Sequence, residues 1–69
     1  MEETRIKNNI RKLRFLNGEI TQAELAERVG VTRQTINAIE AAKYSPSLEL
    51  AFKIANEFDK PIEDVFKYS

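Results

Sequence analysis

Apolar residues recur every three to four positions along most of the chain, and this spacing is typical of amphipathic helices. Ile6, Ile10 and Leu13 begin the pattern, with basic residues between them. The pattern predicts five helices, at residues 4–16, 21–30, 32–42, 47–58 and 61–68. No alternating strand pattern of useful length appears. We therefore expect an all-α fold, a compact five-helix bundle that forms one domain over residues 1–69.

Local signals for helix ends support these ranges. Gly18 and Gly30 can adopt the left-handed conformation that follows a helix. Thr21 and Glu24 have the spacing of a capping box, in which each side chain bonds to the other residue's backbone N–H. The remaining start signals are N-cap residues and a proline at a first helical position: Thr32, Ser47 and Pro61.

The segment from residue 22 to residue 41 has the pattern of a helix-turn-helix. Two short helices meet at a tight turn, Val29-Gly30-Val31. Small Ala26 allows the helices to approach closely, branched Ile36 fills the space opposite, and Gly30 allows the positive backbone angle of the turn. We expect these three residues to have a structural role.

The second of these helices carries polar residues on the face that packing does not use. Arginine can make two hydrogen bonds to guanine, and glutamine or asparagine can do the same to adenine. Such residues near the start of a projecting helix suit recognition in the major groove of DNA. Gln22 begins the first helix, where a side-chain amide and a helix N-terminus can meet a phosphate. The predicted DNA-binding residues are Gln22, Thr32, Arg33, Gln34, Thr35, Asn37, Lys43 and Tyr44.

The phrases TQAELAERVGVTRQTINAIE and KYSPSLELAFKIA resemble small regulators of the Cro/C1-type (XRE) helix-turn-helix family. The resemblance covers nearly the whole chain. It implies a five-helix bundle that binds palindromic operators as a dimer. It also implies that Gln22 binds phosphate, that Ala38 is limited to methyl contacts, and that Arg14 and Glu40 form an ion pair orienting the recognition helix.

Composition narrows the function further. The chain has no cysteine and no histidine, so we expect no disulfide, no metal site, no cofactor and no catalytic residue. The beginning of the chain is polar, and no apolar run reaches the ~20 residues of a membrane span, so we expect no signal peptide, no membrane contact and a cytoplasmic location. Net charge is zero, but residues 1–20 carry +2 and residues 46–69 carry −2. We therefore expect DNA binding to depend on dimerisation and specific contacts.

A bundle of 69 residues has a small interior, and residues 48–69 offer more apolar side chains than it can cover. We expect a homodimer interface there, formed by Leu50, Phe52, Ile62, Phe66 and Tyr68. The sequence thus predicts a transcriptional regulator, a repressor that binds double-stranded DNA and has no evident small-molecule ligand. An antitoxin-like protein-interaction module with autoregulatory DNA binding is the alternative. An enzyme is not expected, because no nucleophile, metal or nucleotide constellation is present.

Overall fold

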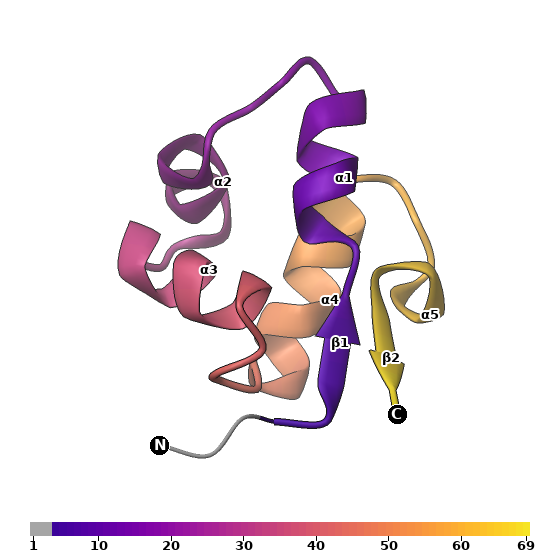
Figure 1. Cartoon of the computed structure of the whole chain (residues 1–69). Helices are drawn as coiled ribbons and strands as arrows, with labels where there is room; N and C mark the ends of the chain where they lie inside the picture. Colours follow the sequence, from indigo (N-terminus) through magenta and orange to yellow (C-terminus); the bar gives the residue numbers. More distant parts are fainter. Residues whose placement is uncertain (1–3) are drawn as a thin grey trace.

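A computed structural model describes residues 4–69, so the start of the predicted domain, residues 1–3, lies outside the described residues. Five helices and two short strands follow one another along the chain (Figure 1). In order they are β1 (Ile6–Asn8), α1 (Ile10–Leu16), α2 (Gln22–Val29), α3 (Arg33–Glu40), α4 (Leu48–Glu57), α5 (Ile62–Val65) and β2 (Phe66–Tyr68). The five predicted helices are present, but an all-α description is wrong because the two strands form a sheet.

The first predicted helix is shorter than its apolar spacing indicated. Residues 6–8 form a strand, and α1 begins only at Ile10. The Asn8 side chain accepts a hydrogen bond from the Ile10 N–H at 3.1 Å and donates to the Ile39 carbonyl at 2.8 Å. Asparagine is a poor helix former that readily bonds to nearby backbone, so Asn8 and Asn9 interrupt the helical pattern.

The last predicted helix is also replaced in part by a strand. α5 has four residues, and from Phe66 the backbone is extended and pairs antiparallel with β1. Ile6 lies opposite Tyr68, Lys7 opposite Lys67, and Asn8 opposite Phe66. Pairing of segments about sixty positions apart gives the backbone hydrogen bonds that a longer α5 would otherwise have made internally.

Three helix starts follow the predicted caps, whereas Pro61, predicted at a first helical position, is the N-cap of α5. Thr21 and Glu24 form the capping box of α2, with Thr21 N–H donating to Glu24 Oε1 at 2.8 Å and Glu24 N–H donating to Thr21 Oγ1 at 3.0 Å. Thr32 and Ser47 cap α3 and α4 through hydrogen bonds to backbone N–H groups three residues on. Gly30 ends α2 with a φ of 80°.

One core joins the helices. Side chains from α1, α2, α3, α4 and α5 all contribute, and within residues 4–69 no charged or polar residue is buried in it. The buried cluster consists of Ile10, Leu13, Ile20, Leu25, Ala26, Val29, Ile36, Ile39, Leu50, Ile54, Ala55, Phe58 and Val65. In the part of the chain described, no helix is both long and apolar enough to cross a membrane. The core fixes α2 and α3 as one unit beside α1 and α4 (Figure 1).

Candidate nucleic-acid interface

α2 and α3 form the helix pair predicted at residues 22–41. Ala26 is 2% exposed and Ile36 is fully buried, and both belong to the cluster that holds the pair on the bundle. Gly30 makes the turn with its left-handed backbone, and the N–H groups of Gly30 and Val31 both donate to the Ala26 carbonyl. The inner faces of α2 and α3 are thus committed to packing, which leaves the opposite face of α3 for a ligand.

The outer face of α3 carries Arg33, Gln34 and Asn37, all exposed. Among residues 4–69 the side chains of Arg33 and Gln34 have no hydrogen-bonding partner, so their donors and acceptors are available. Thr32 is also exposed, but its hydroxyl accepts from the Thr35 N–H at 3.2 Å and lies 3.0 Å from the Thr35 hydroxyl. Thr32 and half-buried Thr35 therefore use these hydrogen-bonding groups to cap the start of α3.

The loop after α3 extends this surface. Lys43 and Tyr44 are exposed and lie with α3 around a shallow, mainly apolar hollow. Its lining consists of Thr32, Gln34, Thr35, Ala38, Lys43 and Tyr44. Five of these six were predicted to bind DNA, and the sixth, Ala38, contributes a methyl group to the middle of α3.

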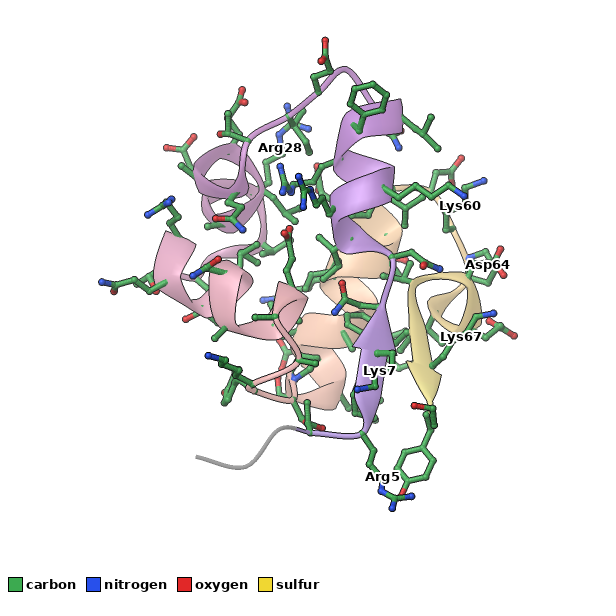
Figure 2. All side chains as sticks on the ribbon, in the orientation of Figure 1. Arg5, Lys7, Arg28, Lys60, Asp64 and Lys67 are labelled. Atoms are coloured by element: carbon green, nitrogen blue, oxygen red, sulfur yellow. The ribbon has the colours of Figure 1, made fainter. Side chains whose placement is uncertain are left out.

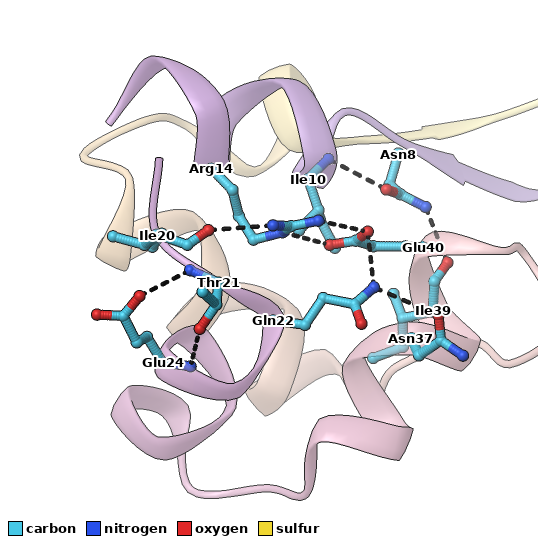
Figure 3. A network of polar contacts seen from close by, with 10 residues as sticks. All are labelled: Asn8, Ile10, Arg14, Ile20, Thr21, Gln22, Glu24, Asn37, Ile39 and Glu40. Atoms are coloured by element: carbon cyan, nitrogen blue, oxygen red, sulfur yellow. Dashed lines mark hydrogen bonds and ion pairs between the residues drawn. The ribbon is translucent and has the colours of Figure 1, made fainter. Parts of the chain in front are cut away.

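An ion pair fixes the far end of α3 to α1 (Figure 3). Arg14 Nε lies 2.7 Å from Glu40 Oε2, and Arg14 Nη2 lies 3.0 Å from Glu40 Oε1. The Arg14 and Glu40 side chains are only 16% and 10% exposed. Arg14 Nη1 also donates to the Ile20 carbonyl at 3.0 Å, so the guanidinium joins α1, the α1–α2 loop and α3. A two-pronged contact of this kind has little freedom to rotate.

Gln22 lies against the same carboxylate. Its Nε2 donates to Glu40 Oε1 at 3.1 Å and to Asn37 Oδ1 at 3.3 Å (Figure 3). Both amide hydrogens of Gln22 therefore point to groups on α3. A phosphate at the start of α2 would have to be met by the main-chain N–H groups of Gln22 and Ala23.

The capping box beside Gln22 changes one ionisation. Hydrogen bonds from the Thr21 backbone and then from its hydroxyl lower the pKa of Glu24 below its usual value of 4.5, and Arg28 adds a smaller effect in the same direction. Glu24 thus remains charged and holds the first turn of α2 at neutral pH.

Charge is spread unevenly over the molecule. The labelled Lys60, Asp64 and Lys67 lie on the side of α5 and β2, away from α2 and α3 (Figure 2). Residues 22–41 carry Arg28 and Arg33 against three glutamates, a net charge of −1. The α3 surface therefore offers directed hydrogen bonds more than bulk positive charge. Within residues 4–69, no three acidic residues come close enough together to hold a metal ion.

The predicted dimer residues differ in how much of each side chain is exposed. Leu50 is 8% exposed and belongs to the core, so it has little surface to offer an interface. It lies on the buried side of α4 with Ala51 and Ile54. Phe52, on the other side of α4, is 47% exposed, and Tyr68 at the end of β2 is 75% exposed. Ile62 and Phe66 are half-buried against the core.

The sequence pattern did not indicate the contribution of Asn8. Its amide joins β1 to the last turn of α3 by donating to the Ile39 carbonyl, next to Glu40 (Figure 3). The signal available was the Asn8-Asn9 pair inside an otherwise helical pattern, since such residues often mark a helix start. Only the folded chain shows that α3 is the partner.

Comparisons with known proteins agree with this geometry. A family model described as helix-turn-helix matches residues 10–65. An uncharacterized HTH-type transcriptional regulator of Methanocaldococcus jannaschii is 54% identical over 63 residues, covering 91% of this chain and 94% of the relative. The uncharacterized HTH-type transcriptional regulator YgzD of Bacillus subtilis is 51% identical over 61 residues, covering 88% of this chain and 91% of the relative.

A solved structure has the same fold. The chain matches a crystal structure of a protein from Bacteroides fragilis with a TM-score of 0.76 and 24% identity. The match covers 90% of this chain and 98% of the other. The arrangement of helices and strands is therefore one that occurs in a known protein.

Proposed function

Because the chain belongs to the Cro/C1-type helix-turn-helix family of transcriptional regulators, which is not enzymatic, we propose that it is a sequence-specific DNA-binding repressor. In this proposal a dimer binds a palindromic operator, and α3 of each subunit enters the major groove. Repression follows from occupancy, because a dimer across a promoter excludes polymerase from the same DNA.

One observation carries the proposal. Arg33, Gln34 and Asn37 project from one exposed face of α3, while Ile36 and Ile39 fix the opposite face in the core. Side chains of these types match the hydrogen-bonding edges that bases present in the major groove. A rigid helix that exposes them together can bring them to successive base pairs.

The neighbouring residues complete the surface. Lys43 and Tyr44 lie beside the start of α3 and can approach the sugar–phosphate backbone. Thr32 and Thr35 place the first turn of α3, and both residues line the same hollow. Because residues 22–41 carry no net positive charge, we expect weak non-specific affinity.

We place the two-fold interface at Phe52, Ile62, Phe66 and Tyr68. These residues lie on α4, α5 and β2 and leave aromatic surface exposed that the core does not use. To bind successive major grooves on one side of DNA, a dimer formed there must hold its two copies of α3 about 34 Å apart. Burial of aromatic side chains would also stabilise a domain of this size.

Selection of bound sequences from a random duplex pool tests the DNA proposal. We expect two inverted half-sites about 10 base pairs apart, centre to centre. A single half-site without symmetry would contradict dimeric binding, and recovery of no sequence preference would contradict sequence-specific binding. Transcription from a promoter that contains the selected site should fall as the protein is added, and an increase would contradict repression.

Sedimentation tests the dimer proposal independently of DNA. Phe52→Glu should lower the dimer fraction strongly at tens of micromolar protein, since it places a charge in the proposed contact. Phe15→Glu is the matched control, because Phe15 is 65% exposed at the end of α1, outside the proposed interface. Equal behaviour of both variants, or a monomeric parent protein, would contradict the interface.

A further inference from the structure

The Arg14–Glu40 pair determines which groups donate and which accept in the neighbouring hydrogen bonds of Gln22 and Asn37. A guanidinium can only donate, and a carboxylate can only accept. Arg14 donates to both carboxylate oxygens of Glu40, at 2.7 and 3.0 Å. Glu40 therefore presents only acceptors to its other neighbour, Gln22.

Gln22 transmits this direction to α3. An amide could offer either its oxygen or its NH₂ group, but the Glu40 carboxylate accepts only the NH₂ group. One hydrogen of Nε2 is used on Glu40 Oε1 at 3.1 Å, and the second points to Asn37 at 3.3 Å. Asn37 must therefore turn its own oxygen toward Gln22, because two NH₂ groups facing each other cannot bond.

The orientation of Asn37 then follows from the network. With Oδ1 facing Gln22, the end of the exposed Asn37 amide that has no hydrogen bond within residues 4–69 is Nδ2, a donor. Two-pronged recognition of adenine requires an oxygen and an NH₂ group presented together. Guanine presents two acceptors, N7 and O6, in the major groove and needs donors alone.

We propose that Asn37 selects guanine over adenine at one base pair, and that Gln22 is the positioning residue that sets this preference. The inference rests on the proposed function and concerns the same surface of α3. Gln22 acts here without touching a base, by fixing which end of the Asn37 amide faces the DNA. Exchange of the Gln22 donor for a group that cannot donate releases the Asn37 amide to rotate.

Selection from a random pool with variants tests the proposal. Asn37→Ala identifies the base pair, since only that pair should lose its preference in each half-site. Wild-type protein should prefer guanine to adenine there by about tenfold, within the range of a good side-chain–base contact. Asn56→Ala is the matched control, an exposed asparagine on α4, and should leave every preference unchanged.

Two substitutions of Gln22 separate positioning from packing. Gln22→Met keeps length without a donor, and the preference for guanine should fall to about twofold or less. Gln22→Lys keeps a donor toward Glu40 and Asn37, and the preference should remain. A general loss of fold would change every base preference at once. Circular dichroism is therefore the folding control, and the spectrum of each variant should match that of wild type.

Several results would overturn the proposal. Adenine at the Asn37-dependent pair in the wild-type selection would do so, as would Gln22→Met with an unchanged preference. A selected site in which no pair depends on Asn37 would also do so, while leaving the proposed function intact. If wild-type protein selects no sequence from the pool, the proposed function itself fails and the inference fails with it.

Discussion

Removal of the Glu40 carboxylate should destabilise the protein strongly, because it leaves a partly buried guanidinium unpaired. Glu40→Ala removes two hydrogen bonds from Arg14 and one from Gln22, and leaves a guanidinium that is only 16% exposed without its counter-ion. Loss of one partner from a buried pair costs about 3–5 kcal/mol. Because this pair is partly reached by solvent, we expect a cost of about 3 kcal/mol.

That cost is large for this chain. A domain of 69 residues has a free energy of unfolding of about 3–10 kcal/mol. A loss of 3 kcal/mol therefore lowers Tm by about 12–24 °C, at ~4–8 °C per kcal/mol in domains of this size. Glu40→Ala should thus be close to unfolding at moderate temperature.

Urea denaturation of a double-mutant cycle measures the contribution of the pair. Arg14→Ala and Glu40→Ala should each destabilise, and the double variant should lose about 2 kcal/mol less than the sum of the two, because no unpaired charge remains in it. Glu49→Ala is the control, since the Glu49 and Lys53 side chains are 81% and 54% exposed and lie 3.5 Å apart. It should change stability by less than about 0.5 kcal/mol.

A cost of Glu40→Ala no greater than that of Glu49→Ala would contradict this prediction. A coupling energy below about 0.5 kcal/mol would also refute it, since that is the value of an exposed pair on a helix. Either result would mean that water, rather than the protein, compensates the charge of Arg14.

Three further predictions concern a helix cap, a pair of residues with left-handed backbone and a base contact. Thr21→Ala should raise the pKa of Glu24 toward 4.5 in an NMR titration. Because folding lowers this pKa, the contribution of Glu24 to stability is complete above the unfolded pKa. That contribution is lost as pH falls through the folded pKa. Gly30→Ala should destabilise by about 1–2 kcal/mol because φ is 80°, whereas Ala42→Gly, at φ 58°, should stabilise by about 0.5–1 kcal/mol in thermal unfolding. Arg33→Ala should cost about 1–3 kcal/mol on the selected site and little on random DNA in an anisotropy titration.

Each of these has a result that contradicts it. An unchanged Glu24 titration would mean that the Thr21 hydroxyl does not contribute to the lowered pKa, since the backbone N–H of residue 21 remains in the variant. Stabilisation by Gly30→Ala would mean that the turn can relax away from positive φ. Equal weakening on selected and random DNA would make Arg33 a phosphate contact instead of a base contact.

The starts of the central helices could be predicted from sequence because their causes are local. An N-cap side chain such as Thr21, Thr32 or Ser47 bonds to a backbone N–H only three residues away. Gly30 likewise ends α2 through its own backbone conformation. The sequence indicates the end of α3 less clearly than these starts, because Ala42 adopts a left-handed conformation that an alanine side chain does not favour.

The two strands could not be predicted, because their cause is not local. The apolar spacing that begins at Ile6 fits a helix, but Ile6 lies opposite Tyr68 in the sheet. The backbone hydrogen bonds of such a ribbon depend on a partner at the other end of the chain. A single-segment pattern contains no information about that partner.

The amino-acid sequence by itself determined the helix pair, its turn and the polar residues on the outer face of α3. These depend on helical periodicity, caps and a glycine, all of which act within a few residues. Only the tertiary structure decided that Gln22 turns both amide hydrogens toward α3 and that Leu50 is buried. Amide orientation and burial depend on which groups from distant segments arrive alongside, and in this protein the donor Arg14 and the acceptor Glu40 set that choice.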